Sequence, residues 1–572
     1  MINIKEKIAT VLAGAVEGLT SEEIRDMIEI PADSRMGDYA FPCFRLAKVL
    51  RKAPPMIAQG IAEKLQENGL FEKVEHVNAY VNMFLSRKAF MMELVSGVAE
   101  EKERYGSSDI GQNRRVIVEF SSPNIAKPFH IGHIRSTVIG NSIHKIYDFL
   151  GYDTVRINHL GDYGTQFGKM IVSYRRWGNE ADVTREPIKT LLGYYVKFHE
   201  ESEKDPSLEN EAREVFTKLE NGEPEETRLW QWFRDESLKE FNRVYKMLGI
   251  EFDSFAGESF YSDKMDRILS MLKGAGLLKE SEGAQIVDLE AYGMSPALIT
   301  KKDGSSLYIT RDIAAAVYRK EHYDFYKNLY IVASQQNLHF QQWIKIIELL
   351  GLDWAKDCVH IPFGLVSLEE GTMSTRHGRV VFLEEVLTRA VNQTRQIVLE
   401  KNVNTDNIDV TARQVGIGAV IFQELSNNRI KDYVFSWDKV LNFEGETGPY
   451  VQYTHARASS VLRNGGDSTT QTLAAAGKAD MGYITGDSAY ELAKLIYRFP
   501  EIVLEAGDKY EPSIITRHIV DIAQSFNKFY HDEHILVDDE EEKRAKLLLV
   551  YAAKQTIHNG LLLLGMEAPE RM

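Results

Sequence analysis

One segment of the chain indicates its fold most clearly: Ser121-Ser122-Pro123-Asn124-Ile125-Ala126-Lys127-Pro128-Phe129-His130-Ile131-Gly132-His133. Residues 116–120 precede it as an apolar run typical of a strand, and the residues after it repeat apolar side chains at helical spacing. A second apolar run, residues 154–160, follows Gly151, at which we expect the helix to end. The segment therefore predicts a strand, loop, helix and strand with the two strands parallel. Such units bind ligands where the first strand ends and the helix begins. The helical apolar positions are Ile134, Val138, Ile139, Ile143, Ile146 and Leu150.

The loop carries basic side chains where many nucleotide-binding loops carry glycines. The chain has no G-x-G-x-x-G after this strand and no G-x-x-x-x-G-K-[ST] anywhere. Lys127, His130 and His133 instead lie at the expected helix N-terminus, where unpaired N–H groups attract phosphate. Imidazole N–H groups can donate to phosphate oxygens, and Gly132 lets a flat base approach the backbone. A bare His-x-x-His also fits a metal pair or two helix-capping histidines, but its place between strand and helix favours a phosphate site.

Composition limits the class of protein. At 572 residues the chain is too long for one core, and three or four domains are expected. The net charge of −16 argues against a protein that only coats nucleic acid. It leaves two possibilities open: a protein that binds no nucleic acid, or one that holds RNA on restricted basic patches.

Cysteine usage and hydropathy favour a cytoplasmic protein. Cys43 and Cys358 are too few for a disulfide framework or a cysteine-rich zinc site, so we expect no structural zinc. No run approaches the ~20 apolar residues that cross a bilayer. Residues 8–16 could be mistaken for a signal peptide, but Glu6 and Glu17 favour a surface helix. The chain shows no coiled-coil heptads or exposed apolar tract, which favours a monomer.

The residues of the quoted segment resemble a known signature. Glu119, Ser122, Asn124, Lys127 and His130-Ile131-Gly132-His133 resemble the first signature of class I aminoacyl-tRNA synthetases, and their surroundings resemble arginyl-tRNA synthetases. Further matching segments follow in one order along almost the whole chain, which is more specific than any single motif. They are residues 158–168, 308–312, 336–340, 373–376 and 448–453.

The pattern of elements predicts a multidomain α/β protein. Residues 1–110 carry signals of a small α+β domain, and residues 111–390 alternate strand-like and helix-like segments as in a doubly wound, Rossmann-like parallel sheet. That domain is interrupted by insertions at about 171–250 and 262–302. Residues 391–572 are dominated by amphipathic helical patterns. The resemblance implies that the first domain contacts the outer corner of tRNA and that the last one binds the anticodon. Residues 531–534, His-Asp-Glu-His, fit a metal site less well than a polar loop.

The resemblance implies that the protein ligates L-arginine to tRNA(Arg) through an arginyl adenylate made from ATP with Mg²⁺. The implied catalytic residues are Lys127, His130, His133, Ser374 and Arg376. The implied ATP-binding residues are His130, Gly132, His133, Phe363, Met373 and Ser374. The second signature departs from the class pattern Lys-Met-Ser-Lys-Ser, because residues 372–376 are Thr-Met-Ser-Thr-Arg. Lys127, just before the histidines, resembles the lysine of arginyl enzymes that lack the second signature lysine.

Recognition of arginine requires acceptors, because a guanidinium has five N–H donors and no acceptor. The resemblance assigns Glu119, Tyr308 and Asp312 to the side chain of arginine, and an ion pair with Asp312 would discriminate against lysine. It assigns Ser122, Asn124 and Gln336 to the α-amino group and His130 to the carboxylate. Taken singly, Asp312 also fits a cap for a helix beginning at Ile313, and Glu119 fits a simple strand end.

The anticodon contact is expected in the helical C-terminal region, where unstacked bases can lie on aromatic rings. Tyr450 and Tyr453 are the candidates, although either residue also fits core packing. Two other hypotheses remain beside an arginine–tRNA ligase: a class I synthetase for another amino acid, and a non-catalytic relative that binds tRNA.

Overall fold

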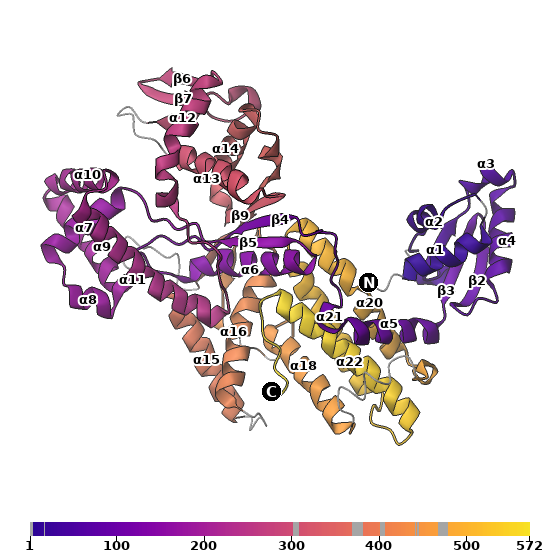
Figure 1. The fold of residues 1–572 in the computed structure, drawn as a ribbon. Coiled ribbons are helices and arrows are strands. Elements are labelled where there is room, and N and C mark those ends of the chain that lie inside the picture. The colour runs from indigo at the N-terminus through magenta and orange to yellow at the C-terminus, as the bar shows by residue number, and fades with distance from the viewer. Residues whose placement is uncertain are drawn as a thin grey trace.

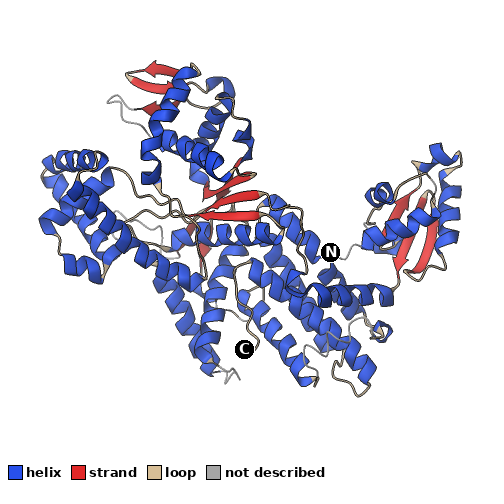
Figure 2. Ribbon diagram, viewed as in Figure 1, coloured by secondary structure: helices blue, strands red, loops and turns tan. Residues whose placement is uncertain are grey.

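The computed structural model describes residues 4–16, 18–31, 33–300, 308–368, 381–400, 407–440, 442, 445–466 and 479–572. A small N-terminal domain, a central domain with a parallel sheet, and a helical C-terminal region follow one another along the chain (Figure 1). Strands are confined largely to the central sheet, the N-terminal domain and one peripheral layer, and helices form the rest (Figure 2). The predicted multidomain α/β class is confirmed.

The central sheet contains the predicted strand–helix–strand unit. Its four strands are all parallel in the order β10-β9-β4-β5. Successive side chains of β4 enter two different cores: Val116 and Val118 pack on the side of α6, and Ile117 packs on the side of α13 and α14. Both faces of the sheet are therefore covered, which explains the uninterrupted apolar run of β4. The bounds are β4 Arg115–Glu119, α6 Ile134–Phe149, β5 Asp153–Ile157, α13 Tyr308–Tyr323, β9 Lys327–Ala333, α14 Asn337–Leu349 and β10 Cys358–Phe363.

The order of the strands reverses at β4. The chain passes from β4 to its neighbour β5, then returns to the opposite side of β4 to form β9 and afterwards β10. A crevice for ligands is expected outside the carboxyl ends of β4 and β9 at such a point. Gly140 of α6 lets this helix lie directly on the sheet, since an added Cβ would come within 2.2 Å of the Cβ of Phe120.

Two insertions extend from the central domain on different sides (Figure 1). The first is purely helical, and its longest helix, α11, runs back toward the sheet domain. The second contains an antiparallel sheet in the order β6-β7-β8. The first insertion contains α7 Thr165–Trp177, α8 Glu180–Arg185, α9 Pro187–Lys204, α10 Ser207–Glu220 and α11 Pro224–Leu248. The second contains η4 Glu258–Lys264, α12 Met265–Gly274, β6 Leu278–Ser281, β7 Ala284–Val287, η5 Glu290–Tyr292 and β8 Ala297–Thr300.

The N-terminal domain is a three-stranded antiparallel sheet, in the order β1-β3-β2, with helices packed on it. Thr20 and Glu23 form a capping box at the start of α2, which fixes where that helix begins. Helix α5 then leads into the body of the protein. The bounds are α1 Ile4–Ala15, α2 Ser21–Met27, η1 Ser34–Met36, β1 Tyr39–Pro42, α3 Leu46–Leu50, α4 Pro54–Leu65, β2 Phe71–Val77, β3 Tyr80–Leu85, α5 Arg87–Glu101 and η2 Lys102–Arg104.

The C-terminal region is a bundle of long helices beneath the sheet domain (Figure 1). Its last helix, α22, buries most of its length between α18, α20 and α21. None of the helices in the described ranges combines the length and apolar character needed to span a membrane. The bounds are β11 Val366–Leu368, α15 Leu383–Glu400, α16 Ile408–Leu425, β12 Tyr433–Phe435, α17 Trp437–Val440, α18 Gly448–Asn464, η9 Met481–Tyr483, α20 Asp487–Lys509, α21 Ser513–Asp532 and α22 Glu540–Leu563.

Candidate active site

The loop after β4 holds an unusual backbone conformation. Ser121, Ser122 and Ala126 have φ angles of 71°, 47° and 59°, a left-handed region that costs energy for residues with a Cβ. The surrounding elements hold this conformation: the N–H of Ser121 donates to Ser136 Oγ at 3.0 Å, and the N–H of Ala126 donates to Ser237 Oγ at 3.1 Å. Helices α6 and α11 therefore both fix the loop, and strain of this kind is often found at functional sites.

His130 and His133 lie where the loop enters η3 Ile131–His133 and then α6. The N–H of Gly132 donates to Nδ1 of His130 at 3.0 Å, and the N–H of His130 donates to Nδ1 of His133 at 3.1 Å. Burial lowers the pKa of His130 to about 4 and lowers the pKa of His133 well below its usual value. Both rings are therefore neutral at pH 7, with the proton on Nε2.

These bonds show that two interpretations of the His-x-x-His pattern, a helix cap and a phosphate site, are compatible. The two histidines do cap the helical segment, as one alternative held, but capping uses only Nδ1 of each ring. Each Nε2–H remains as a donor at a helix N-terminus, which is the arrangement that phosphate oxygens favour. The ring centroids are 4.0 Å apart, so two donors can reach one group.

Glu119 ends β4 and is buried against Arg319 of α13. Oε2 of Glu119 accepts from Nη1 of Arg319 at 2.5 Å, and Nη2 of Arg319 lies 3.3 Å from Nδ1 of His159. Glu119 is therefore the last residue of its strand, as one alternative held, and its carboxylate is bound by a guanidinium of the same chain.

Asp312 lies inside α13, which begins at Tyr308. The alternative in which Asp312 caps a helix beginning at Ile313 is therefore wrong. Its Oδ2 is 2.5 Å from Nε2 of His339, the third residue of α14. Tyr308 is 57% exposed at the start of α13, and its ring lies 5.6 Å from the guanidinium of Arg311.

Electrostatic effects show that the two carboxylates share one environment. Burial lowers the pKa of His159, and the charges of Glu119 and Asp312 both raise it. Burial raises the pKa of Tyr330 well above its usual value, and the same two carboxylates raise it further. Glu119 and Asp312 therefore lie near the same two rings, one after β5 and one on β9.

A third carboxylate, Glu258, connects this environment to the phosphate side of the crevice. Burial raises the pKa of Glu258 to about 7, its ion pair with Arg311 at 3.1 Å lowers it, and Asp312 raises it. As a smaller effect, Lys127 lowers the pKa of Glu258, and it also lowers that of His133. Lys127 thus lies within electrostatic reach of both the carboxylate cluster and the histidines.

The remaining predicted residues lie at or after the carboxyl end of β4, β9 or β10. Oγ of Ser122 is buried and has no hydrogen-bond partner among the described residues, so it is a candidate to meet a ligand. Asn124 is exposed and pairs with Gly161 in an isolated bridge, and Gln336 is exposed at the end of η6 Ser334–Gln336, after β9. Phe363 is buried at the end of β10.

Two groups of predicted residues lie elsewhere. Met373, Ser374 and Arg376 fall outside the residues that the structure describes. Tyr450 and Tyr453 lie on α18 of the helical region, separate from the crevice.

Sequence reasoning named neither Glu258 nor Arg319 as site residues, and gave no role to His159, Arg311 or His339. A signal for Arg319 was present: it follows an apolar run in α13 and lies seven residues after Asp312, on the same face of the helix. An arginine on a buried face requires an acceptor. Glu258 carries no comparable local signal.

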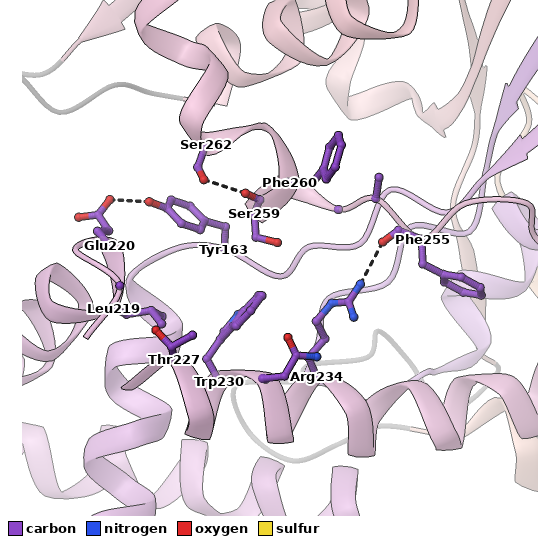
Figure 3. Close-up of a pocket in the computed structure, with 14 residues that line it drawn as sticks. Tyr163, Leu219, Glu220, Thr227, Trp230, Arg234, Phe255, Ser259, Phe260 and Ser262 are labelled. Atoms are coloured by element: carbon purple, nitrogen blue, oxygen red, sulfur yellow. Dashed lines mark hydrogen bonds between the residues drawn. The ribbon is translucent and has the colours of Figure 1, made fainter. Parts of the chain in front are cut away.

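A cavity of about 660 Å³ adjoins this site between α11 and η4 (Figure 3). Tyr163 forms one wall and donates from its hydroxyl to Glu220 at 2.8 Å. The same ring lies 4.6 Å from the guanidinium of Arg311, which connects the cavity wall to the carboxylate cluster. Trp230 and Arg234 of α11 line the cavity opposite Tyr163.

Comparison with known families gives three matches in sequence order. Residues 3–85 match the family model of the arginyl-tRNA synthetase N-terminal domain. Residues 95–437 match the catalytic domain of class I (R) tRNA synthetases, and residues 451–572 match the DALR anticodon-binding domain.

Individual relatives agree along the whole length. The chain is 58% identical to an arginine–tRNA ligase of Clostridioides difficile and 55% identical to one of Halothermothrix orenii, with 100% of both chains covered in each case. Its fold is similar to the solved arginyl-tRNA synthetase of Thermus thermophilus, with a TM-score of 0.79 at 25% identity and 100% of both chains covered. From the three family models in order and the identity over the full length, we conclude that the chain belongs to the arginyl-tRNA synthetase family.

Proposed function

We propose that this arginine–tRNA ligase activates L-arginine with ATP in the crevice at the carboxyl end of β4, and then transfers the arginyl group to tRNA(Arg). One observation carries this assignment: the carboxylates of Glu119 and Asp312 share an environment that Glu258 and Lys127 connect to the histidines of the α6 N-terminus. Acceptors for a cationic side chain and donors for a triphosphate thus meet at one end of the sheet.

In the first step, a carboxylate oxygen of arginine attacks the α-phosphorus of ATP. The bond from that phosphorus to the bridging oxygen breaks, pyrophosphate leaves, and an arginyl adenylate forms. The protein contributes position and charge stabilisation rather than covalent chemistry. In this proposal, Nε2–H of His130 and of His133 donate to phosphate oxygens, and the ammonium of Lys127 opposes the negative charge that develops on them.

The second step transfers the arginyl group. A hydroxyl of the terminal ribose of tRNA attacks the carbonyl carbon of the adenylate, the carbon–oxygen bond to AMP breaks, and the hydroxyl proton is lost.

The carboxylates and the loop after β4 select the amino-acid substrate. We assign Glu119, Tyr308 and Asp312 to the guanidinium, because charge-assisted and planar pairs fit that group and not the compact ammonium of lysine. We assign Ser122, Asn124 and Gln336 to the α-amino group. Oγ of Ser122 is buried and meets no hydrogen-bond partner within the part of the chain that the structure describes, which supports the second assignment.

Mg²⁺ enters this proposal as part of the ATP complex, bound to the phosphates. No group of three or more histidine, cysteine or acidic side chains in the described ranges is arranged to hold a metal ion. Phe363, at the end of β10, and Gly132 are assigned to the nucleotide. Met373, Ser374 and Arg376 keep their predicted roles in ATP binding and catalysis.

The anticodon contact is assigned to a surface on α18 and α21. The guanidinium of Arg457 lies 4.8 Å from the ring of Tyr453 and 5.5 Å from the ring of Tyr530. Oδ1 of Asn527 accepts a hydrogen bond from Nη1 of Arg457. Nδ2 of Asn527 donates to the hydroxyl of Tyr450 at 3.0 Å. Exposed rings beside a guanidinium are the groups on which unpaired bases stack.

We also infer a cytoplasmic monomer. Cys43 and Cys358 are both free, buried thiols, which is the usual state of cysteine in a reducing compartment. Light scattering coupled to size exclusion tests the monomer, since a mass twice that of the chain would contradict it.

One assay tests the proposed function as a whole. ATP–pyrophosphate exchange is measured with each amino acid in turn, with and without tRNA. Exchange supported by arginine is expected. Exchange with a different amino acid would instead indicate another class I synthetase, and tRNA binding without any exchange would indicate a non-catalytic relative.

A further inference from the structure

Both carboxylates assigned to the arginine side chain already hold a cationic or proton-donating partner from the chain itself. Glu119 is paired with Arg319, and Asp312 is paired with His339. Each bond uses one carboxylate oxygen, Oε2 or Oδ2, and leaves the other oxygen able to accept from a ligand. Two partners from different helices, α13 and α14, therefore act on the two acceptors of one site.

Arg319 is held rigidly. Its side chain is fully buried, it spans Glu119 and His159, and the rings of Tyr261 and Tyr330 lie 5.8 Å and 5.6 Å from its guanidinium. A buried guanidinium is tolerated only where its charge and donors are matched. The pairing with Glu119 thus fixes the orientation of a carboxylate that otherwise could rotate at the end of its strand.

His339 is placed differently. Its side chain is 27% exposed, and its ring stands edge-on to Phe340 at 6.0 Å. Nε2 contacts Oδ2 of Asp312 at 2.5 Å. Because His339 lies in the first turn of α14 and Asp312 inside α13, this bond joins the two helices.

We propose that Arg319 and His339 are positioning residues for arginine recognition, each occupying one oxygen of a site carboxylate and directing the other oxygen toward the substrate guanidinium. This inference rests on the assignment of Glu119 and Asp312 to the arginine side chain. Neither positioning residue touches the substrate. Arg319 and His339 determine which oxygen of each carboxylate faces the substrate. The two free oxygens can then accept from different N–H groups of the guanidinium.

The pairing also limits repulsion among the carboxylates of the site. Glu119, Asp312 and Glu258 are three acidic groups in one environment, and like charges repel one another. Arg319, His339 and Arg311 give each of them one partner. Removing a partner is expected to weaken arginine binding selectively, because the orphaned carboxylate is no longer held in one orientation, while the ATP-binding histidines lie at a different helix end.

Steady-state ATP–pyrophosphate exchange in the presence of tRNA(Arg) tests the proposal through the separate KM values of arginine and ATP. Arg319→Lys keeps the charge but loses the planar fork that spans Glu119 and His159. His339→Ala removes the donor to Asp312. For each variant, the KM of arginine is expected to rise about tenfold or more, as loss of a charge-assisted bond implies, with the KM of ATP unchanged within about twofold.

A conservative variant and two matched controls separate positioning from general damage. His339→Gln retains an N–H donor and is expected to recover most of the arginine KM lost in His339→Ala. Arg267→Ala removes an exposed arginine of α12 that pairs with Glu321 of α13, the helix that carries Arg319. His360→Ala removes a histidine of β10 whose ring bonds the carbonyl of Val332. Both controls are expected to keep the wild-type arginine KM.

Two results would overturn the proposal: an arginine KM within about twofold of wild type in both Arg319→Lys and His339→Ala, or equal increases in the KM of arginine and of ATP. If Arg319→Lys does not fold, the two variants of His339 decide alone. A wild-type protein that shows no exchange with arginine would reject the proposed function itself, whereas normal wild-type exchange with unaffected variants would reject only the positioning roles.

Discussion

The guanidinium of Arg135 lies 3.6 Å from the carboxylate of Glu424, and both side chains are fully buried where α6 meets α16. Arg135 is the second residue after His133. Nη1 of Arg135 also donates to the carbonyl of Gly364 at 2.9 Å and to that of Lys431 at 2.7 Å. One side chain thus joins the helix of the first signature to the segment after β10 and to the loop that precedes β12.

Arg135→Lys is expected to destabilise the junction between the sheet domain and the helical region. A lysine cannot satisfy several carbonyls on two segments, and breaking a buried network costs on the order of 3 kcal/mol. The urea midpoint of unfolding, followed by circular dichroism, measures the effect. Arg115→Ala is the control, since that arginine forms an exposed pair with Asp153. Equal midpoints for both variants would refute the structural role of Arg135.

Glu424 is expected to make stability depend on pH. Burial raises its pKa to about 8 and Arg135 lowers it, so the folded protein holds this proton more tightly than the unfolded chain does. The associated stability is fully present below the unfolded pKa of about 4.3 and is lost as the pH rises through about 8. As the pH is raised from 5 to 8, the free energy of unfolding is therefore expected to fall less in Glu424→Gln than in the wild-type protein. Parallel curves of unfolding midpoint against pH for the two proteins would show that Glu424 is not the responsible group.

Lys127→Ala is expected to slow adenylate formation far more than it weakens arginine binding. The ammonium lies within electrostatic reach of His133, at the phosphate end of the site, and loss of one such group costs on the order of 100-fold in rate. The kcat of ATP–pyrophosphate exchange measures this, with the KM of arginine alongside. Lys239→Ala, which removes an exposed lysine paired with Glu236 on α11, is the control. An unchanged kcat in Lys127→Ala would remove its catalytic role.

Asp312→Asn is expected to lose selectivity for arginine. The amide cannot form the charge-assisted pair with a guanidinium, so the KM of arginine is expected to rise about tenfold or more. Exchange with arginine and with lysine, measured side by side, gives the ratio of kcat/KM for the two amino acids. If both arginine constants remain at their wild-type values, Asp312 is not an arginine ligand.

Tyr453→Ala is expected to weaken tRNA binding without altering arginine activation at saturating tRNA. Tyr453 is 39% exposed on α18, and loss of one stacking ring costs a nucleic-acid complex about tenfold in affinity. The KM of tRNA(Arg) in aminoacylation measures the change. Tyr292→Ala, at an exposed tyrosine of the second insertion, is the control. The same tRNA KM in both variants would exclude Tyr453 from the interface.

Local patterns in the sequence determined the strand–loop–helix–strand unit. The apolar run of residues 116–120 and the helical spacing after His133 predict β4 and α6 directly, because each depends on neighbours a few residues away. Gly151 ends the helix region with a φ of 81°, as its place in the sequence indicated. The family followed from several motifs in one order. The domain boundaries at about residues 110 and 390 remain predictions, as do the roles of Met373, Ser374 and Arg376.

The partners of the functional side chains were decided only by the tertiary structure. Glu119 and Arg319 are 200 residues apart in the chain, and Arg135 and Glu424 lie on two different helices, α6 and α16. No local pattern encodes such a pair, because a charge on a strand end or a helix face specifies only that some partner must exist. Which group supplies that partner depends on how the elements pack. The sequence thus determined the acceptors and donors of the site, and packing decided which of them are already engaged by the chain and which oxygens remain for a substrate.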